Sequence, residues 1–507
     1  MIRHSKTTSE SWKNLPWKKF RKNLFRLQKR IFKAVRTGDI AKARSLQKLV
    51  LKSTSAKLLA IRQVTQLNKG RKTSGIDGKK ALTFKERFEL FNKLSRVNDW
   101  KHQGLREVPI PKKNGKTRIL KVPTISDRAW QCLVKYALEP AHEATFHARS
   151  YGFRPGRCTQ DAQKMVFNQL KRIGNQFGTS DTNKKKRVIE LDISKCFDRI
   201  SHKSIMDKLI SPTGVKLGIF RCLKAGINPE FPEQGTPQGG VVSPLLANIA
   251  LNGIEDIHPS IRYADDMIFF LKPQDDADKV LNKVSEFLAE RGMEISREKT
   301  KVTATTEGFD FLGWNCKVQK NGKFRSTPSK DNFEAMREKV KAIVNNPNYG
   351  AEVKATKLAP VIRGWRNYHR FCDMSNARDS LWFIAKRAFR VFLKQKSVNR
   401  YKAESLVKKA FPSVSWSENK FVNVKGEKSP YDGDVIYWSQ RESKLYDGIS
   451  AKLLKKQNHT CARCGMRFLP GEDIHLHHID GNHDNWKPKN LEMIHQSCHQ
   501  YTHMSRA

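Results

Sequence analysis

The chain has 507 residues, which is enough for three or more domains that each bury a core of their own. Lys and Arg total 97 against 49 Asp and Glu, and the net charge of +48 indicates a polyanionic partner. No stretch reaches roughly 18 consecutive apolar residues and the start lacks the apolar core of a signal peptide, so nucleic acid is favoured over a membrane. The nine cysteines are few for this length and indicate a reducing compartment.

The first predicted element is a basic amphipathic helix that begins at Trp17. Apolar residues recur there at helical spacing, namely Phe20, Leu24, Leu27, Ile31 and Val35. Lysines and arginines fill the other faces, and such a charged face is either solvated or bound to phosphates. In a chain of this charge we expect the cluster as a whole to contact RNA.

Residues 108–120 predict two strands joined at Asn114-Gly115, a strong hairpin signal. Lys116 and Arg118 follow this turn, where cations can pair with the phosphates of a triphosphate; ordinary edge-strand charges are the alternative. A helix is predicted over 126–138. The loop 151–157 then mixes aromatic and basic residues and suits stacking together with phosphate contact.

Two acidic strands form the centre of the chain. Asp265 and Asp266 interrupt the otherwise apolar run 261–271, which predicts a buried hairpin, and Asp192 ends a second apolar strand over 187–192. An Asp-Asp pair alone is more often a solvated turn, but bare carboxylates in an apolar setting lose several kcal/mol of solvation. Hard oxygen ligands suit Mg²⁺, and two such ions about 4 Å apart support nucleotidyl transfer.

Further motifs flank these acids. A Pro-Gln-Gly-Gly turn lies within 234–248, and the segments 297–300 and 309–314 follow the second acidic strand. With these motifs the chain resembles group II intron-encoded proteins, in which a reverse transcriptase is joined to a splicing (maturase) domain and a DNA endonuclease. Tyr-Ala-Asp-Asp at 263–266 resembles the metal-binding motif of active reverse transcriptases. The resemblance covers nearly the whole chain.

The resemblance implies a role for each motif residue. Asp192, Asp265 and Asp266 would be the catalytic Mg²⁺ ligands. The implied nucleotide-binding residues are Lys116 and Arg118 at the triphosphate, Phe197 at the sugar, Gln238 beside the nucleotide, and Lys299 as a general acid near the pyrophosphate. A core phenylalanine is the alternative for Phe197. Residues 70–78 resemble the N-terminal extension that grips template, and 309–314 resembles the primer grip.

Three helices are predicted after the palm, over 333–347, 358–371 and 381–395, each from an apolar stripe. The aromatic residues of the second helix are interpreted as core. Arg363, Arg366, His369 and Arg370 match the maturase motif, and the resemblance implies that they position intron RNA. From 416 to 438 the helical signal lapses, which predicts a linker and DNA-contacting segment.

The C-terminal residues carry two sets of candidate metal ligands. Cys461 and Cys464, with His495 and Cys498, form two pairs whose two-residue gaps suit one tetrahedral Zn²⁺, although the usual module has cysteine where His495 stands. So small a domain needs such a site for stability.

The second set indicates catalysis. His499 and His503 share one helix face and could bind a metal together with His477. This arrangement resembles an HNH nuclease of ββα-metal type, which implies His478 as the general base and Asn490 as the residue that orients it. A purely zinc-binding DNA module is the alternative.

The predicted fold is a multidomain α+β protein: a right-hand polymerase with an antiparallel palm sheet, an α-helical thumb and maturase domain, and a small zinc-stabilised ββα-metal domain. The predicted boundaries are 1–95 for the N-terminal extension, 96–315 for fingers and palm, 316–411 for thumb and maturase, 412–450 for the linker, and 451–507 for the nuclease. The function implied by the resemblance is reverse transcription, splicing and second-strand nicking during intron mobility; a splicing-only maturase is the alternative. The expected partners are intron RNA, double-stranded target DNA and dNTPs, with no membrane, in a bacterial cytoplasm or an organelle.

Overall fold

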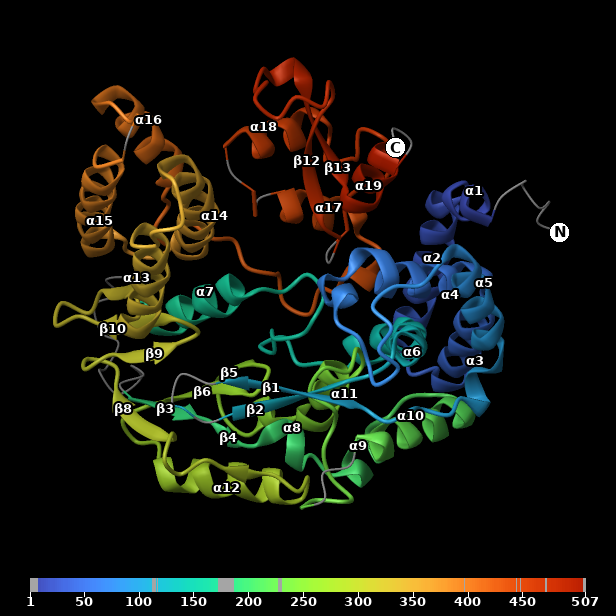
Figure 1. Ribbon diagram of the computed structural model, residues 1–507. Coiled ribbons are helices and arrows are strands. Elements are labelled where there is room, and N and C mark those ends of the chain that lie inside the picture. The colour runs from blue at the N-terminus through green and yellow to red at the C-terminus, as the bar shows by residue number, and fades with distance from the viewer. Residues whose placement is uncertain are drawn as a thin grey trace.

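A computed structural model of the chain describes residues 8–111, 115, 117–171, 187–226, 230–395, 397–443, 445–446, 448–469 and 472–504, without the side chains of 8–10 and 69. Figure 1 shows β-sheets near the centre, blue N-terminal helices on one side, yellow and orange helices on the other, and the red C-terminal elements between them. None of the described helices has the length and apolar character needed to cross a bilayer.

The N-terminal extension is helical, as its apolar periodicity predicts. Phe20, Leu24, Ile31 and Val35 are buried on one face of α2, which packs against α3, α4 and α6. The elements of the extension are α1 (Thr8–Lys13), α2 (Trp17–Arg36), α3 (Ile40–Lys52), α4 (Thr54–Arg62), η1 (Gln63–Leu67), η2 (Lys69–Lys72), α5 (Phe84–Lys93) and η3 (Leu94–Asp99).

The predicted fingers hairpin is present as β1 (Arg106–Pro111) and β2 (Thr117–Val122), which pair antiparallel. The palm sheet has the strand order β5-β6-β3-β8, all antiparallel neighbours. Its strands are β3 (Arg187–Leu191), β5 (Ser260–Tyr263), β6 (Asp266–Leu271) and β8 (Lys301–Ala304). All of β3 pairs with residues 267–271 of β6, and this pairing brings the two acidic segments of the sequence together.

Helices surround this sheet. α6 (Ile125–Glu143) is almost wholly buried and covers the predicted helix 126–138. The remaining elements of the palm are α7 (Thr159–Leu170), β4 (Ile193–Ser194), α8 (Cys196–Arg199), α9 (His202–Lys208), α10 (Thr213–Ala225), α11 (Ser243–Leu251), η5 (Ile254–Asp256), α12 (Ala277–Ala289) and β7 (Glu294–Ile295).

A second sheet joins the palm to the thumb. It consists of β9 (Phe309–Phe311), β10 (Trp314–Val318) and β11 (Phe324–Pro328), and the thumb helices are α13 (Lys330–Val344), α14 (Ala351–His369), α15 (Ser375–Leu393) and α16 (Arg400–Ala410). Trp314 stacks on Tyr368 with ring centroids 4.6 Å apart, and the Tyr368 hydroxyl donates to the Leu312 carbonyl at 2.7 Å. These contacts fix α14 against the turn between β9 and β10.

The segment after the thumb is packed on the palm. It contains η6 (Pro430–Asp432) and α17 (Val435–Ser443), so the end of the predicted irregular stretch is helical. Arg441 Nη2 lies 2.6 Å from Asp161 Oδ1 in a buried ion pair, and the Tyr431 hydroxyl donates to Glu139 at 2.6 Å. Long-range polar contacts therefore anchor a segment whose composition resembles a free linker.

The C-terminal elements are α18 (Gly448–Lys456), β12 (Ile474–His478), η7 (Pro488–Asn490), β13 (Leu491–His495) and α19 (Gln496–Met504). β12 and β13 form an antiparallel pair, and α19 contacts both strands. This unit lies beside the N-terminal helices (Figure 1): Arg21 of α2 pairs with Glu472, and Arg62 donates to the Ser497 carbonyl at 3.2 Å.

Candidate active site and metal-ligand clusters

The three predicted catalytic acids lie at neighbouring strand ends. Asp192 directly follows β3, while Asp265 and Asp266 lie at the tight turn between β5 and β6, where Tyr263 pairs with Asp266. Ala264 has a φ of 61°, so the turn holds a left-handed backbone at a non-glycine residue. Such strain at a turn that carries two acids fits a site whose geometry the surrounding structure imposes.

The electrostatics of the acids favour a cation. Loss of hydration raises the pKa of Asp265, and it raises the pKa of Asp266 to about 6, with further contributions from the neighbouring carboxylates. Asp266 still reaches solvent at the mouth of the site. Lys299 Nζ lies 2.5 Å from Asp192 Oδ2, so a cationic side chain already approaches the group. The mutual repulsion and the oxygen donors fit a divalent ion.

Buried residues hold the acidic turn in place. Arg262 lies in β5 with 0% exposure, pairs with Glu255 at 2.6 Å, and donates to the Ala264 carbonyl at 3.2 Å. Asn248 accepts from Arg262 at 2.9 Å and donates to the Gly152 carbonyl at 2.9 Å. A Cβ atom at Gly152 would overlap the Ala264 backbone nitrogen, which explains a glycine at this close approach.

Two of the predicted nucleotide-binding residues, Arg118 and Gln238, are in direct contact. Arg118 donates from Nε to Gln238 Oε1, and Gln238 Nε2 donates to both carboxylate oxygens of Asp198 at 3.2 Å. The ring of Phe197 meets that of Phe153 edge-on, with centroids 6.1 Å apart. Phe197 is half-buried, so it packs partly on the core and is partly open to the site. Lys116 lies outside the described residues.

The maturase residues divide by exposure. Arg363 is exposed on α14, whereas Arg366 donates to the carbonyl oxygens of Phe411 and Pro412 at 3.4 and 2.7 Å. His369 is 0% exposed, and its Nε2 lies 2.9 Å from Asn332 Oδ1. The prediction that His369 contacts RNA is therefore corrected, because its imidazole belongs to the thumb core.

Arg370, the fourth maturase residue, is also buried, at 8% exposure. Its guanidinium lies 4.5 Å from the centre of the Phe371 ring. Among the four predicted RNA contacts, Arg363 is thus the side chain that faces solvent openly.

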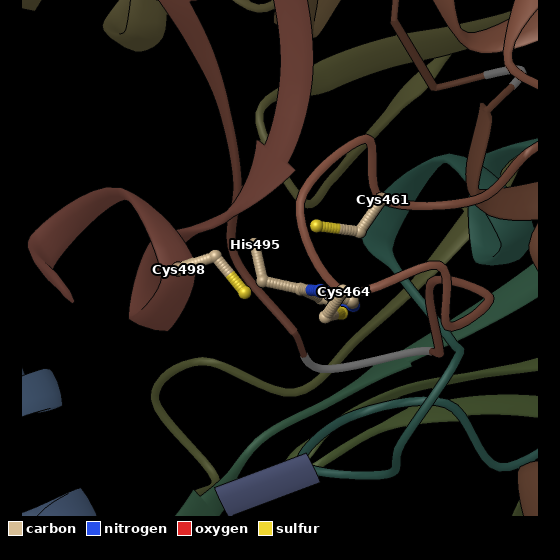
Figure 2. A group of neighbouring side chains, drawn as sticks. All are labelled: Cys461, Cys464, His495 and Cys498. Carbon is tan, nitrogen blue, oxygen red and sulfur yellow. Dashed lines mark hydrogen bonds between the residues drawn. The ribbon is translucent and has the colours of Figure 1, made fainter. Parts of the chain in front are cut away.

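Four side chains converge at the first C-terminal cluster (Figure 2). The ligand atoms of Cys461, Cys464, His495 and Cys498 all lie within 4.8 Å of one another. The cysteines Cys461 and Cys464 share a tight turn in which the Gly465 N–H donates to the Cys461 carbonyl at 2.8 Å, with φ of 67° at Gly465. Hydrogen bonds from the Cys461 and Cys498 thiols lower the pKa of Cys464, which favours the thiolate that a metal needs.

His495 is oriented as a metal ligand would be. Its Nδ1 lies 3.4 Å from Cys464 Sγ, while its Nε2 lies 3.1 Å from Glu472 Oε2. The same Nε2 lies 3.2 Å from Arg21 Nη2, and a carboxylate on the far ring nitrogen is one of the usual partners of a metal-bound histidine. Three sulfurs and one nitrogen at this spacing fit tetrahedral Zn²⁺.

The second cluster comes from β12 and α19. Ligand atoms of His477, His499 and His503 lie within 4.8 Å of one another, and the His499 and His503 rings are 4.5 Å apart. Burial and then the neighbouring imidazoles lower the pKa of His499 to about 4, so this ring is neutral near pH 7. Neutral imidazoles on one face are able to ligate a divalent metal.

His478 and Asn490 lie beside that cluster. His478 is the last residue of β12, its ring contacts those of His483 and Trp486, and its Nε2 has no hydrogen-bond partner among the described residues. Asn490 donates to Asp480 Oδ1 and to the Asn485 carbonyl, both at 2.9 Å. Asn490 therefore fixes the loop that follows His478.

The sequence did not identify several site residues. Asp198 is close to Asp192 in the sequence. Its charge was a local signal that it belongs to the same site, on the side where the nucleotide is expected to bind. Arg262 is close to the acidic turn in the sequence, but only the fold reveals that its side chain donates a hydrogen bond to the Ala264 carbonyl oxygen of that turn. Arg21 and Glu472 are 451 positions apart, so no local pattern could have joined them.

Comparisons with known proteins agree with this architecture. Residues 110–316 match the family model described as reverse transcriptase (RNA-dependent DNA polymerase), residues 12–94 match the N-terminal domain of reverse transcriptase, and residues 333–410 match the group II intron maturase-specific domain. Among solved structures, apo telomerase from Candida Tropicalis aligns over 62% of each chain at 14% identity with a TM-score of 0.36.

Two relatives extend over most of the chain. Maturase-like protein 1 of Euglena gracilis is 41% identical over 463 residues, which are 90% of this chain and 98% of the relative. Its namesake from Euglena longa is 37% identical over 78% of this chain and 86% of the relative. Group II intron-encoded protein LtrA of Lactococcus lactis subsp. cremoris is 27% identical over 50% of this chain and 54% of its own length.

The fold and the matched segments define a reverse transcriptase joined to a maturase domain, in a protein of mixed helix and sheet. The chain belongs to the group II intron reverse transcriptase and maturase family.

Proposed function

We propose that this protein is an RNA-directed DNA polymerase that also assists the splicing of a group II intron RNA. The observation that carries the polymerase is the grouping of Asp192, Asp265 and Asp266 at the paired strands β3 and β6 of a reverse transcriptase domain. Mg²⁺ bound by these acids would activate the primer hydroxyl and stabilise the leaving pyrophosphate. Burial first, and then the charges of Asp265 and Asp192, raise the pKa of Asp266, and a divalent ion would offset both effects.

The other residues of the site would position the incoming nucleotide and protonate the leaving pyrophosphate. Lys299 carries its proton beside Asp192, where it could pass that proton to the departing pyrophosphate. Arg118 is tied to Gln238, so a triphosphate paired with Arg118 would lie next to the Gln238 turn. The half-buried Phe197 ring would then face the sugar of a dNTP.

The RNA partner is supported by charge and by the maturase match. A net charge of +48 neutralises many phosphates, and Arg363 presents an open guanidinium on α14 within the maturase-specific segment. We propose the intron RNA as the long-lived partner in a ribonucleoprotein. Relatives from Euglena and from a bacterium leave an organelle and a bacterial cytoplasm as the proposed locations.

We further propose that residues 451–507 form an HNH-type nuclease that nicks the second strand of a DNA target and so supplies the primer. The order β12-β13-α19, with three histidine ligand atoms within 4.8 Å, supports a ββα-metal site. His478 would take a proton from the attacking water; its Nε2 is buried and makes no hydrogen bond to the described residues, so no described protein group competes for that atom. The metal held by the three histidines would stabilise the charge on the phosphate.

A Zn²⁺ ion held by the first C-terminal cluster, Cys461, Cys464, His495 and Cys498, would have a structural role. Its four donors complete a tetrahedral set and leave no open position for a substrate. The small core beside it, which includes Leu454, Phe468 and Ile494, needs such a link to hold its shape.

A splicing-only maturase is the second candidate, and the name of the Euglena relatives favours it. The intact acidic site favours polymerisation. The test is extension of a DNA primer on an RNA template by the purified ribonucleoprotein with Mg²⁺. Wild type should extend the primer and Asp192→Asn should not, with intron binding unchanged. Normal splicing without any extension by wild type would establish the second candidate instead.

The nuclease has its own test. His478→Ala should keep zinc and fold yet fail to nick the second strand of doubly end-labelled target DNA, while Lys489→Ala, a change at an exposed neighbour of Asn490, should nick normally. Second-strand nicking by His478→Ala at the wild-type rate would refute the assignment of the base.

A further inference from the structure

An open pocket of about 890 Å³ lies where the N-terminal extension meets α19. Its walls come from opposite ends of the chain: Arg71, Lys72, Lys80 and Arg87 on one side, and His499 and His503 on the other. Figure 1 shows this juxtaposition of the blue and red elements. Two of the three histidines proposed to bind the nuclease metal thus share a pocket with four cations of the reverse transcriptase extension.

The lysines and arginines among the described residues that line the pocket have no acidic neighbours in its wall. None of the described residues that line it carries a carboxylate. The neighbouring acid Glu86 is already engaged, because it accepts from Lys79 Nζ at 2.6 Å and from the Thr83 N–H at 2.8 Å. A polyanion in this pocket would therefore meet no carboxylate that repels it or competes with it for the cations.

Arg87 has unused donors. Its guanidinium lies 4.8 Å from the centre of the Phe84 ring and 5.4 Å from that of Trp12, which hold it in place. Its Nε and Nη1 are buried and have no hydrogen-bond partner among the described residues. Both atoms are inside the fold, so Arg87 contributes its positive charge to the wall of the pocket, where it has no carboxylate partner among the described residues.

The two walls are fixed relative to each other. Arg128 of α6 donates to the carbonyl oxygens of Gly70 and Thr73 at 3.0 and 2.8 Å, which anchors the loop that carries Arg71 and Lys72. Across the junction, Arg62 donates to the Ser497 carbonyl at 3.2 Å and Arg21 pairs with Glu472. The pocket is therefore a built feature of the docked C-terminal unit.

We propose that this pocket binds a DNA strand, with Arg71, Lys72, Lys80 and Arg87 on backbone phosphates beside the histidine cluster of the nuclease. The nuclease site is then composite, because the reverse transcriptase extension supplies the cations that hold the strand to be cut. DNA is favoured over intron RNA because the pocket opens on His499 and His503, whose chemistry acts on the target. The proposal deepens the proposed nuclease function and rests on it.

A charge-removal variant with a matched control tests binding. Arg71→Ala/Lys72→Ala/Lys80→Ala removes three exposed pocket cations, while Lys42→Ala/Arg44→Ala/Lys48→Ala removes three exposed cations from α3 of the same extension. The pocket variant should bind target DNA about tenfold more weakly near physiological salt, with a salt slope smaller by about 2 to 3, and the control should match wild type. Equal effects of the two variants would overturn the proposal.

A crosslinking measurement separates the pocket from the chemistry. Ala81 lines the pocket and is exposed, and Ala41 on α3 is the matched exposed control; each is replaced by a photoreactive benzoylphenylalanine in the full ribonucleoprotein with labelled target DNA. Crosslinking to DNA from position 81, but not from 41, supports the proposal even if no nicking is seen, in which case the nuclease assignment fails alone. Crosslinking from 81 to intron RNA, or to neither nucleic acid while nicking proceeds, overturns the pocket and leaves the nuclease standing.

Discussion

Arg262 donates a hydrogen bond of 3.2 Å to the carbonyl oxygen of Ala264, and so a fully buried guanidinium holds the turn that presents Asp265 and Asp266. Glu255, also fully buried, lies 2.6 Å from Arg262 Nε and balances its charge. The catalytic turn is thus supported from the core rather than from the solvent side, which makes Arg262 a positioning residue.

Arg262→Met should abolish primer extension and lower the free energy of unfolding by about 3–5 kcal/mol, because it leaves a carboxylate buried without its partner. Glu255→Gln/Arg262→Met should recover much of that stability without recovering extension, since the Ala264 carbonyl still lacks its donor. Denaturant unfolding and primer extension measure the two effects. Arg400→Met, in an exposed pair with Glu404, should change stability by no more than about 1 kcal/mol. Extension restored together with stability would contradict the positioning role.

Arg363 and Arg366 lie three positions apart on α14 and should behave differently. Arg363→Ala should preserve the melting temperature and weaken intron binding, with a salt slope smaller by about 1, because the exposed guanidinium makes no hydrogen bond or ion pair with the described residues. Arg366→Ala should lower the free energy of unfolding by about 1.5–3 kcal/mol, since it releases two carbonyl oxygens after α16. Filter binding across salt concentrations and thermal unfolding separate them. A lower melting temperature for Arg363→Ala would contradict the assignment of Arg363 to RNA binding and of Arg366 to the fold.

The acidic strands show what the sequence could predict. Asp192, Asp265 and Asp266 each interrupt or end a strongly apolar run, so a local pattern marks them, and the pairing of β3 with β6 follows from burial of both runs. The helices α2 and α6 were likewise predictable, because an apolar stripe at helical spacing must face a core.

The burial of side chains on α14 and the packing of the segment after the thumb were not predictable in this way. A stripe indicates that a helix has a buried face, but several neighbours compete for that face, and His369 entered the core because Asn332 and three aromatic rings surround it. Asp161 and Arg441 pair across 280 positions. Contacts of that separation depend on the whole fold, and no local propensity encodes them.

We expect the purified protein to bind zinc through Cys461, Cys464, His495 and Cys498. Cys464→Ala should release zinc and expose the region from about Lys455 onward to protease, because zinc binding supplies a large share of the folding energy of so small a unit. Cys158→Ala, a change in the palm, should leave the zinc content unchanged. Metal analysis of the purified proteins with limited proteolysis is the measurement, and full zinc content in Cys464→Ala would contradict the ligand set.

Acid should destabilise the palm through His142. This ring is 2% exposed, its Nε2 accepts a hydrogen bond from the Ile210 N–H at 3.3 Å, and burial lowers its pKa from 6.5 to about 3. Because the folded pKa is depressed, its contribution is complete above pH 6.5 and is lost as the pH falls from 6.5 toward 3.

His142→Asn offers an amide oxygen that accepts the same bond without titrating. Between pH 6 and pH 4, the free energy of unfolding of wild type should fall more steeply than that of the variant, by up to about 1.4 kcal/mol per pH unit. Denaturant titrations at several pH values measure this difference. Identical slopes would show that His142 is not held neutral by the fold.

The most direct test of the central claim is extension of a DNA primer annealed to RNA, measured with the purified ribonucleoprotein and Mg²⁺. Asp265→Asn/Asp266→Asn removes two carboxylates from the acidic turn, and Asp278→Asn/Glu286→Gln removes two from the exposed face of α12 as the matched control. If the three strand-end acids hold the catalytic metal, the first variant makes no cDNA while binding intron RNA like wild type, and the control extends the primer normally. Extension by Asp265→Asn/Asp266→Asn near the wild-type rate would contradict the account.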